Sequence, residues 1–325
     1  MILISLRIIL MNKSPSRVLP ALAATALLLT GCTSAASSGD EAGTGQAAKV
    51  EVLASFYPLQ YVTEQVGGDR VEVSSLTPPG AEPHDVELSP RQVRSVGETD
   101  LVVYLAGFQS AVDEAIAARE PAHVVDAADT VDLIEGHDDH AEEEGADDAG
   151  HDDAGLDPHF WLDPERLARL AAPVAAALAE ADPANADSYT ANAAALEADL
   201  AALDTELETG LATCERRVVV TSHDAFGYLA DRYDLELVGI SGLDPEAEPS
   251  PARLKEIGDV VRAEGVTTIF GEQLVNPKVA QTLASDLGIT SDVLDPVESL
   301  TDETSDYRGV MEKNLTALRA ALACT

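Results

Sequence analysis

Residues 184–210 read ANADSYTANAAALEADLAALDTELETG, an alanine-rich stretch with apolar side chains at helical spacing. Leucines recur three or four residues apart, at Leu196, Leu200, Leu203 and Leu207, and therefore line one face of a helix. Pro183 separates this helix from an earlier one expected near 164–180. A helix of this length measures about 39 Å, the length of a small domain. The pattern favours a stiff connector between two lobes, and it leaves open a packing helix inside one lobe.

Short apolar runs alternate with helical patterns on both sides of this stretch. Before it, strands are expected at 50–56, 71–76 and 101–105, with helices at 58–67 and 89–97. After it, strands are expected at 217–221, 236–240 and 266–270, with helices near 225–233, 250–264 and 277–287. In each half a Ser-Pro pair, Ser89-Pro90 and Ser250-Pro251, opens a helix after a proline-containing loop. Alternating strands and helices predict parallel sheets.

The predicted fold class is therefore α/β, with two similar lobes whose parallel sheets are flanked by helices and joined by one long helix. We place the N-terminal lobe at residues 49–183, the linking helix at 184–211 and the C-terminal lobe at 212–325. A chain of 325 residues with 46% hydrophobic content is long enough for two such cores.

The charge excludes one class of partner and favours another. The formal net charge is −38, and the first 31 residues are basic, so the remainder is more acidic still. Such a surface repels phosphate backbones, and we expect no nucleic-acid binding. A divalent cation, by contrast, is attracted to it.

The N-terminus predicts export. Lys13 and Arg17 precede an apolar run at 18–30, and Leu29-Thr30-Gly31-Cys32 resembles the lipobox of bacterial lipoproteins. We predict a signal peptide at 1–32 that ends at a lipidated Cys32, and a flexible Ser/Gly/Ala-rich tether at 33–48. The protein would then be anchored to the outer face of the cell membrane or lie in the periplasm. A spanning helix is less favoured because the apolar run is only ~13 residues, and the true start remains open between Met1 and Met11.

The two other cysteines, Cys214 and Cys324, form a candidate disulfide. An even pair in an oxidising compartment is commonly bridged, and two separate buried thiols are the alternative. A cysteine-based metal site is disfavoured because neither cysteine has a close partner such as a CxxC spacing.

The segment 136–153, together with Glu135, is acidic and rich in histidine. Residues 135–153 contain ten acidic residues, three histidines (His137, His140, His151) and no Lys or Arg. This composition cannot bury a core, so we expect a disordered surface loop. It is either a plain solvated insertion or an auxiliary loop that collects metal weakly, because neutral imidazoles bind zinc.

Four separated segments carry the candidate metal chemistry. His84 ends Pro78-Pro79-Gly80-Ala81-Glu82-Pro83-His84, His159 lies in Asp157-Pro158-His159-Phe160-Trp161, His223 lies in Thr221-Ser222-His223-Asp224, and Asp295 lies in Leu294-Asp295-Pro296. Each follows or lies near the end of a predicted strand, where ligands of open α/β sheets collect. Three imidazoles and one carboxylate form a tetrahedral set suited to zinc.

In order, these segments resemble the metal-binding segments of the zinc and manganese family of ABC solute-binding proteins. The resemblance covers nearly all of residues 50–322. It implies two lobes joined by a long rigid helix, with the ion in the cleft between them and held by His84, His159, His223 and Asp295. Family members usually continue Asp-Pro with Leu-Gly, whereas Val297-Glu298 follows here. Whether Asp295, Glu298 or Glu82 completes the site therefore stays open.

The implied function is an extracytoplasmic, monomeric component of an ABC importer that captures Zn²⁺ and passes it to a permease driven by an ATPase. Three histidines favour Zn²⁺ over Mn²⁺, which prefers oxygen ligands, but a manganese-binding protein of the same family is the alternative. A surface adhesin also fits a lipid anchor. A zinc hydrolase fits less well, because four protein ligands leave no open position for water and no HExxH motif is present. We therefore expect a binding protein and no enzyme.

Overall fold

The computed structural model describes residues 49–136, 155–302 and 304–325, and Ala47–Thr325 form one compact unit. Cys32 and the three loop histidines, His137, His140 and His151, lie outside the described residues. Among the helices that are described, none is both long and apolar enough to cross a membrane. Because one compact unit contains both lobes, the proposed domain limits at 183 and 212 stay a prediction.

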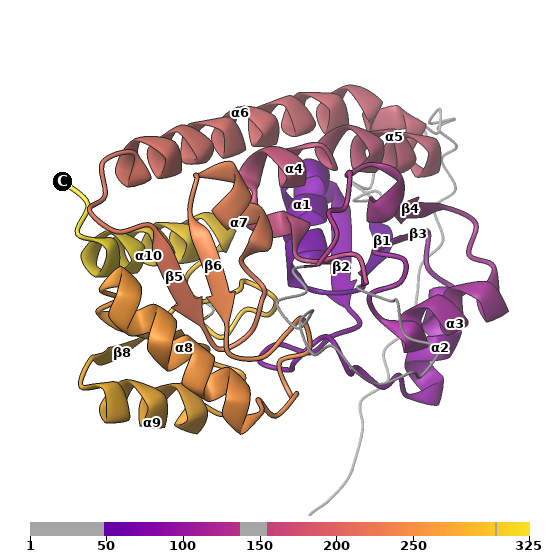
Figure 1. The fold of residues 1–325 in the computed structure, drawn as a ribbon. Helices are drawn as coiled ribbons and strands as arrows, with labels where there is room; N and C mark the ends of the chain where they lie inside the picture. Colours follow the sequence, from indigo (N-terminus) through magenta and orange to yellow (C-terminus); the bar gives the residue numbers. More distant parts are fainter. Residues whose placement is uncertain (1–48, 137–154, 303) are drawn as a thin grey trace, which may run out of the picture. The chain divides into compact units, whose positions relative to one another are not determined.

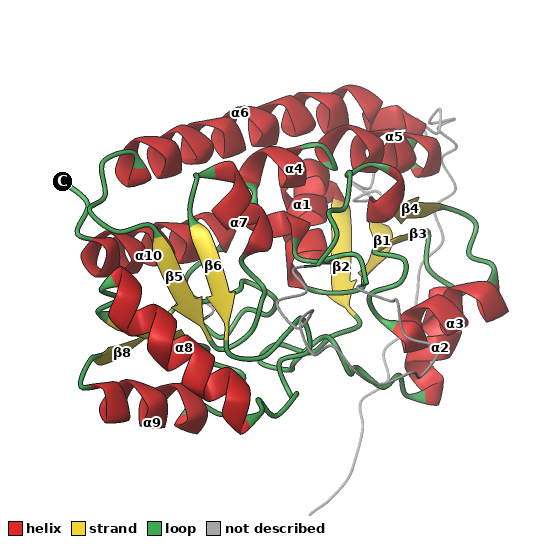
Figure 2. Cartoon of the chain, viewed as in Figure 1, coloured by secondary structure: helices red, strands yellow, loops and turns green. Residues whose placement is uncertain are grey.

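Two parallel four-stranded sheets form the framework (Figures 1 and 2). The first contains β1 (Val50–Ala54), β2 (Val71–Ser75), β3 (Leu101–Tyr104) and β4 (Val124–Asp126), in the order β2-β1-β3-β4. The second contains β5 (Val218–Thr221), β6 (Glu236–Gly239), β7 (Thr268–Gly271) and β8 (Thr290–Val293), in the order β6-β5-β7-β8. The matching order confirms two similar lobes. The edge strands β4 and β8 were not predicted.

Helices cover both faces of each sheet. In the N-terminal lobe these are α1 (Tyr57–Gly67), α2 (Pro90–Val96), α3 (Ser110–Arg119), α4 (Pro164–Ala168) and α5 (Ala171–Ala181). In the C-terminal lobe they are α7 (Gly227–Arg232), α8 (Pro251–Glu264), α9 (Lys278–Leu287) and α10 (Tyr307–Leu322). The strands alternate as a two-faced sheet requires: Val219 of β5 faces the central core, while Val218 and Val220 pack against α8 and α9.

The two Ser-Pro pairs begin helices as expected. Ser89 forms a capping box with Gln92 at the start of α2, and Pro90 occupies the first turn. Ser250 accepts the Arg253 backbone N–H at the start of α8, with Pro251 next to it. The caps turn the chain directly from a loop into a helix in both lobes, and the first of these loops carries His84.

The connector is α6 (Ala186–Leu211), a helix of 26 residues. Figure 1 shows it running along both lobes. It packs against α1, α4 and α5 of the N-terminal lobe and against α10 of the C-terminal lobe. Its buried stripe includes the four leucines Leu196, Leu200, Leu203 and Leu207. These side chains belong to one hydrophobic core that also contains residues of β1, β3 and β5. The helix therefore joins the lobes and is also part of their common core.

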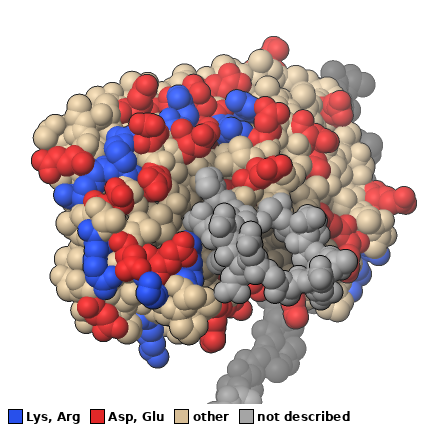
Figure 3. All heavy atoms as spheres, viewed as in Figure 1, with Lys and Arg blue, Asp and Glu red and all other residues tan. Residues whose placement is uncertain are grey.

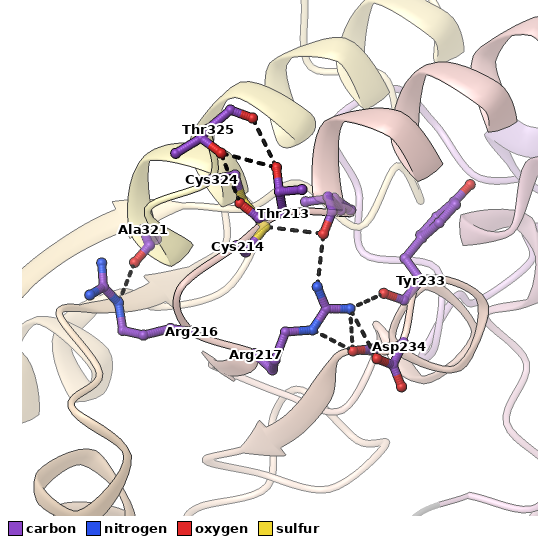
Figure 4. The surroundings of a disulfide bond; sticks show 10 residues. Thr213, Cys214, Arg216, Arg217, Tyr233, Asp234, Ala321, Cys324 and Thr325 are labelled. Carbon is purple, nitrogen blue, oxygen red and sulfur yellow. Dashed lines mark hydrogen bonds and ion pairs between the residues drawn. A yellow bond between two sulfur atoms is a disulfide. The ribbon is translucent and has the colours of Figure 1, made fainter.

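Cys214 and Cys324 are joined by a disulfide (Figure 4). The bridge connects the chain just after α6 to the chain just after α10, across a sequence separation of 110 residues. Thr213 and Thr325 add hydrogen bonds beside it. In the chain-entropy model, a loop of this length contributes at most about 4–5 kcal/mol by restricting the unfolded chain. The start and end of the C-terminal lobe are thus covalently fixed together.

Candidate metal centre

Four side chains converge between the lobes, namely His84, His159, His223 and Glu298. His84 lies in the connection from β2 to α2, and His159 directly precedes a short 3-10 turn at Phe160–Leu162. His223 follows β5, and Glu298 follows β8. The carboxyl ends of the parallel strands thus bring donors from both lobes to one place, as the sequence predicted for the three histidines.

The distances fit a tetrahedral ion. One donor atom from each residue lies within 4.8 Å of all the others. Five of the six separations between these atoms run from 3.0 Å, between His159 Nε2 and Glu298 Oε1, to 3.7 Å, between His223 Nε2 and Glu298 Oε1. Donors placed about 2.0–2.1 Å from a zinc ion stand ~3.4 Å apart at the corners of a tetrahedron. Three imidazole nitrogens and one carboxylate oxygen at this spacing are complementary to a single divalent cation.

His159 is held in the tautomer that a metal requires. Its Nδ1 lies 2.8 Å from Asp157 Oδ1, and its backbone N–H donates to the same oxygen at 2.9 Å. Because a carboxylate only accepts, Nδ1 carries a proton, so the lone pair that a metal needs is on Nε2 once that nitrogen has lost its own proton. The Trp161 ring packs against His159 at a centroid distance of 5.2 Å.

His223 is oriented in the same way by Glu272. Its Nδ1 lies 2.7 Å from Glu272 Oε1, and both side chains are almost fully buried. Neither Asp157 nor Glu272 was given a role from the sequence, although Asp157 stands in one of the motifs quoted for the resemblance. The signal that would have found them is chemical: a buried ligating imidazole needs a second acceptor for its other nitrogen.

The structure does not bring Asp295 together with the histidines. Its Oδ1 accepts the Val297 backbone N–H at 2.8 Å, and its Oδ2 lies 3.4 Å from Gln273 Nε2. Val297 adopts a left-handed backbone with φ of 60°, which is rare for a β-branched residue. Asp295 thus stabilises the turn, and Glu298, beyond it, reaches the site. The structure favours Glu298, one of the alternatives that the sequence left open.

Glu82, the other alternative, lies at the margin of the site. Its Oε1 is 3.9 Å from His84 Nε2 and accepts the His84 backbone N–H at 3.1 Å. Burial raises the pKa of the Glu82 carboxyl. Because Glu82 accepts the His84 backbone N–H, its side chain organises the loop that carries His84. It lies outside the group of four donor atoms.

In the absence of a cation, protons on the histidines offset the negative charge of the carboxylates in this buried group. Burial by itself would lower the pKa of His159, but Asp157 and Glu298 outweigh burial and raise it to about 10. Burial would raise the pKa of Glu298, but its hydrogen bonds with His159 and His84 hold it well below its usual range. Burial would also lower the pKa of His223, yet Glu272 raises it. A metal ion must therefore displace protons when it binds.

Buried hydrogen bonds cross from one lobe to the other beside the site. Trp161 Nε1 donates to Pro296 O at 2.8 Å, and the Tyr307 hydroxyl donates to Trp161 O at 2.6 Å. The Tyr228 hydroxyl donates to Asp157 O at 2.7 Å. The segment that carries His159 is thus fixed directly to the lobe that supplies His223 and Glu298.

Two α/β lobes that each contribute donors to one enclosed site define a two-lobed binding protein with a metal-type centre. The family described as zinc-uptake complex component A, periplasmic, matches residues 52–321. The chain belongs to this family.

Similar proteins agree with this assignment. The chain is 33% identical over 308 residues to the high-affinity zinc uptake system protein ZnuA of Bacillus subtilis, covering 93% of this chain and 96% of that protein. It is 34% identical over 284 residues to the zinc-binding lipoprotein AdcA of Streptococcus pneumoniae, but it spans only 55% of that longer protein. The crystal structure of the Zn(II)-bound ZnuA-like domain of Streptococcus pneumoniae AdcA superposes with a TM-score of 0.70 at 33% identity. That match covers 85% of this chain and 99% of the domain.

Exchange of the two candidate carboxylates tests the fourth ligand. Glu298→Gln should lower Zn²⁺ affinity by more than about 100-fold, since even the outer partners of ligands are worth about 10–100-fold. Asp295→Asn should change affinity little, because an amide keeps an oxygen for the Val297 N–H. Competition titration against a chromogenic chelator measures both variants. The reverse order of effects would return Asp295 to the site.

Zinc affinity should rise with pH well above the range of an ordinary histidine. The raised pKa of His159, about 10, means that the metal-free ring keeps its proton at neutral pH and loses it when zinc binds. Apparent affinity should therefore increase about tenfold per pH unit for each proton released. The same titration at several pH values between about 6 and 8 gives the slope, and an affinity that stays constant over this range would contradict a proton-filled site.

Proposed function

We propose that this chain is the extracytoplasmic binding component of an ABC importer, which captures Zn²⁺ and delivers it to the membrane permease. The observation that carries this proposal is the convergence of three imidazole nitrogens and one carboxylate oxygen from both lobes. Nitrogen-rich sites favour zinc, whereas manganese prefers oxygen. The names of the relatives, a zinc uptake system protein and a zinc-binding lipoprotein, support the same ion.

Enclosure of the site supports transport over catalysis. The side chains of His159 and His223 are 0% exposed, that of Glu298 is 3% exposed and that of His84 is 15% exposed. A catalytic zinc keeps one coordination position for water, and here a fourth protein donor takes that position. We propose a carrier and no enzymatic activity, because a closed four-ligand set suits retention and transfer of the ion.

The family also implies the partners and the location. A permease and its ATPase would receive the ion. The lipidated Cys32 would hold a monomer at the outer face of the membrane, with the ordered unit beyond the tether. Figure 3 shows acidic side chains spread over the viewed face of the described residues, with Lys and Arg among them. The excess of acid favours approach of a divalent cation over that of an anion.

A transport role is tested in cells and in the purified protein. A strain that lacks this protein should grow normally in zinc-replete medium and poorly when zinc is chelated. The wild-type chain should restore growth, and His223→Ala should not, because it removes a buried donor. Elemental analysis of wild type purified without added metal should find about one zinc per chain. A manganese content in its place, or rescue by manganese alone, would favour the manganese alternative.

We further propose that the acidic segment 136–153 collects zinc close to the site. The chain on either side of it is paired, since Glu135 and Leu156 form an antiparallel bridge and the Gly136 N–H donates to Gly155 O at 3.1 Å. Gly155 and Leu156 also line a cavity of about 420 Å³ that reaches His84. Imidazoles on a segment anchored there would raise the ion concentration beside the ligands.

Replacement of residues 137–153 by a short glycine turn removes all three histidines of the segment and isolates this contribution, because the Gly136–Gly155 pairing can remain. The full chain should bind one tight zinc and additional weak equivalents in calorimetry. The shortened chain should keep the tight equivalent, since all four donors lie outside the replaced segment, and it should lose the weak ones. A single equivalent in both proteins would leave the segment without a metal role.

A further inference from the structure

His84 is held differently from the other two histidines. Asp157 and Glu272 fix the Nδ1 atoms of His159 and His223. For His84, the polar contacts of the ring within the described part of the chain are at Nε2, with Glu298 Oε1 at 3.4 Å, His159 Nε2 at 3.3 Å and Glu82 Oε1 at 3.9 Å. Among the residues that the structure describes, no carboxylate forms a hydrogen bond with its Nδ1. Its position must therefore be set by other means.

Phe108 and Gln109, at the connection from β3 to α3, contact both the ring and the backbone of this ligand. The Phe108 ring packs edge-on against the His84 imidazole, with centroids 4.8 Å apart and planes at 82°. Gln109 Nε2 donates to Pro83 O at 3.0 Å, which is the carbonyl immediately before His84. The two residues thus restrain the same ligand from two directions.

The hydrogen bonds of Gln109 can form in only one orientation. Thr77 donates its hydroxyl to Ser55 O at 2.8 Å, so its oxygen accepts from Gln109 Nε2 at 2.9 Å. Both amide hydrogens are then used, one on Thr77 and one on Pro83. The opposite amide orientation would place an oxygen against the Pro83 carbonyl, where neither atom can donate. A fixed relay therefore runs from Ser55, at the end of β1, to the loop that carries His84.

This arrangement leaves the amide oxygen of Gln109 without a partner among the described residues. Gln109 is 1% exposed, and its Oε1 accepts no hydrogen bond from any residue that the structure describes. A buried carbonyl without a donor destabilises a fold, and an apolar side chain of the same shape avoids that cost. The amide donor thus serves something other than stability alone, and the group it holds is the peptide next to the metal ligand.

We propose that Gln109 is a positioning residue for the metal ligand His84, acting through Pro83 as Asp157 and Glu272 act on the other two histidines. This inference rests on the proposed zinc site. Removal of the amide donor should release the loop and loosen the bond from His84 to the ion. By analogy with other outer partners of ligands, the expected loss of zinc affinity is about 10–100-fold.

The central variant is Gln109→Met, which keeps the length of the side chain and removes its donor. A matched control is Asn192→Leu, because the Asn192 side-chain amide also donates to a backbone carbonyl of this lobe, Val66 O at 2.9 Å, outside the site. Each variant is compared with wild type for zinc affinity, for the thermal unfolding midpoint of the metal-free protein, and for the visible absorption of Co²⁺ bound in place of zinc, which reports coordination geometry. Each is also made in a His84→Ala background.

A positioning role predicts that Gln109→Met weakens zinc binding and alters the Co²⁺ spectrum, whereas Asn192→Leu changes only the unfolding midpoint. It also predicts that Gln109→Met has no further effect on affinity once His84 is absent. Equal affinity in wild type and Gln109→Met, or a loss that persists without His84, overturns the role.

Two further variants keep these outcomes distinct. If Gln109→Met does not fold, Thr77→Val provides a second test, because it removes one of the two acceptors that hold the amide. Thr77→Val should also lower zinc affinity. An unchanged zinc affinity would overturn the role. Wild-type affinity in His84→Ala itself would instead reject the proposed zinc site. Failure of the inference is thus separable from failure of the function.

Discussion

The buried hydrogen bond from the Trp161 indole to the Pro296 carbonyl is the contact on which the rest of the arrangement depends. Trp161 lies two residues after His159, and Pro296 two residues before Glu298, so this bond brings together ligands from the two lobes. The Tyr307 hydroxyl donates to the carbonyl of the same tryptophan and links α10 to it. Together with the Tyr228 hydroxyl bond to Asp157 O, these contacts fix the distance between donors of two lobes that also share α6 and its apolar stripe. Because the bonds are buried, their loss would leave polar groups unpaired, and the lobes stay together at this point.

The site is organised in advance of its ion. Carboxylates behind His159 and His223 fix the tautomers, and Glu298 closes the group from the other lobe. Negative charge concentrated in a buried place is costly, and protons shared with the imidazoles relieve that cost until a cation arrives. Binding is then an exchange of protons for metal between prearranged donors. The donor set and its geometry select the ion. Movement of the lobes contributes little to this selection, because α6 belongs to the core that both lobes share.

The sequence predicted most of the framework because burial leaves a repeated pattern. Six strands appear as apolar runs, and α6 appears as leucines at helical spacing. The edge strand β8 could not be found this way, since all four of its side chains are exposed and carry no alternation. The short β4 has too few residues to show a period. The three cleft histidines were predicted from their surrounding motifs, and the structure places their side chains together. Glu298 was left open, because its direction depends on the left-handed turn at Val297, and valine gives no local signal for that conformation.

The disulfide between Cys214 and Cys324 makes the C-terminal lobe a covalent ring that begins and ends at one point. Both donors from that lobe, His223 and Glu298, lie inside the ring. A protease that cuts a surface loop between them breaks one peptide bond, but the two fragments stay attached to each other through the disulfide. A nicked molecule can thus keep its ligands together. The bridge therefore adds tolerance of cleavage to whatever stability it contributes.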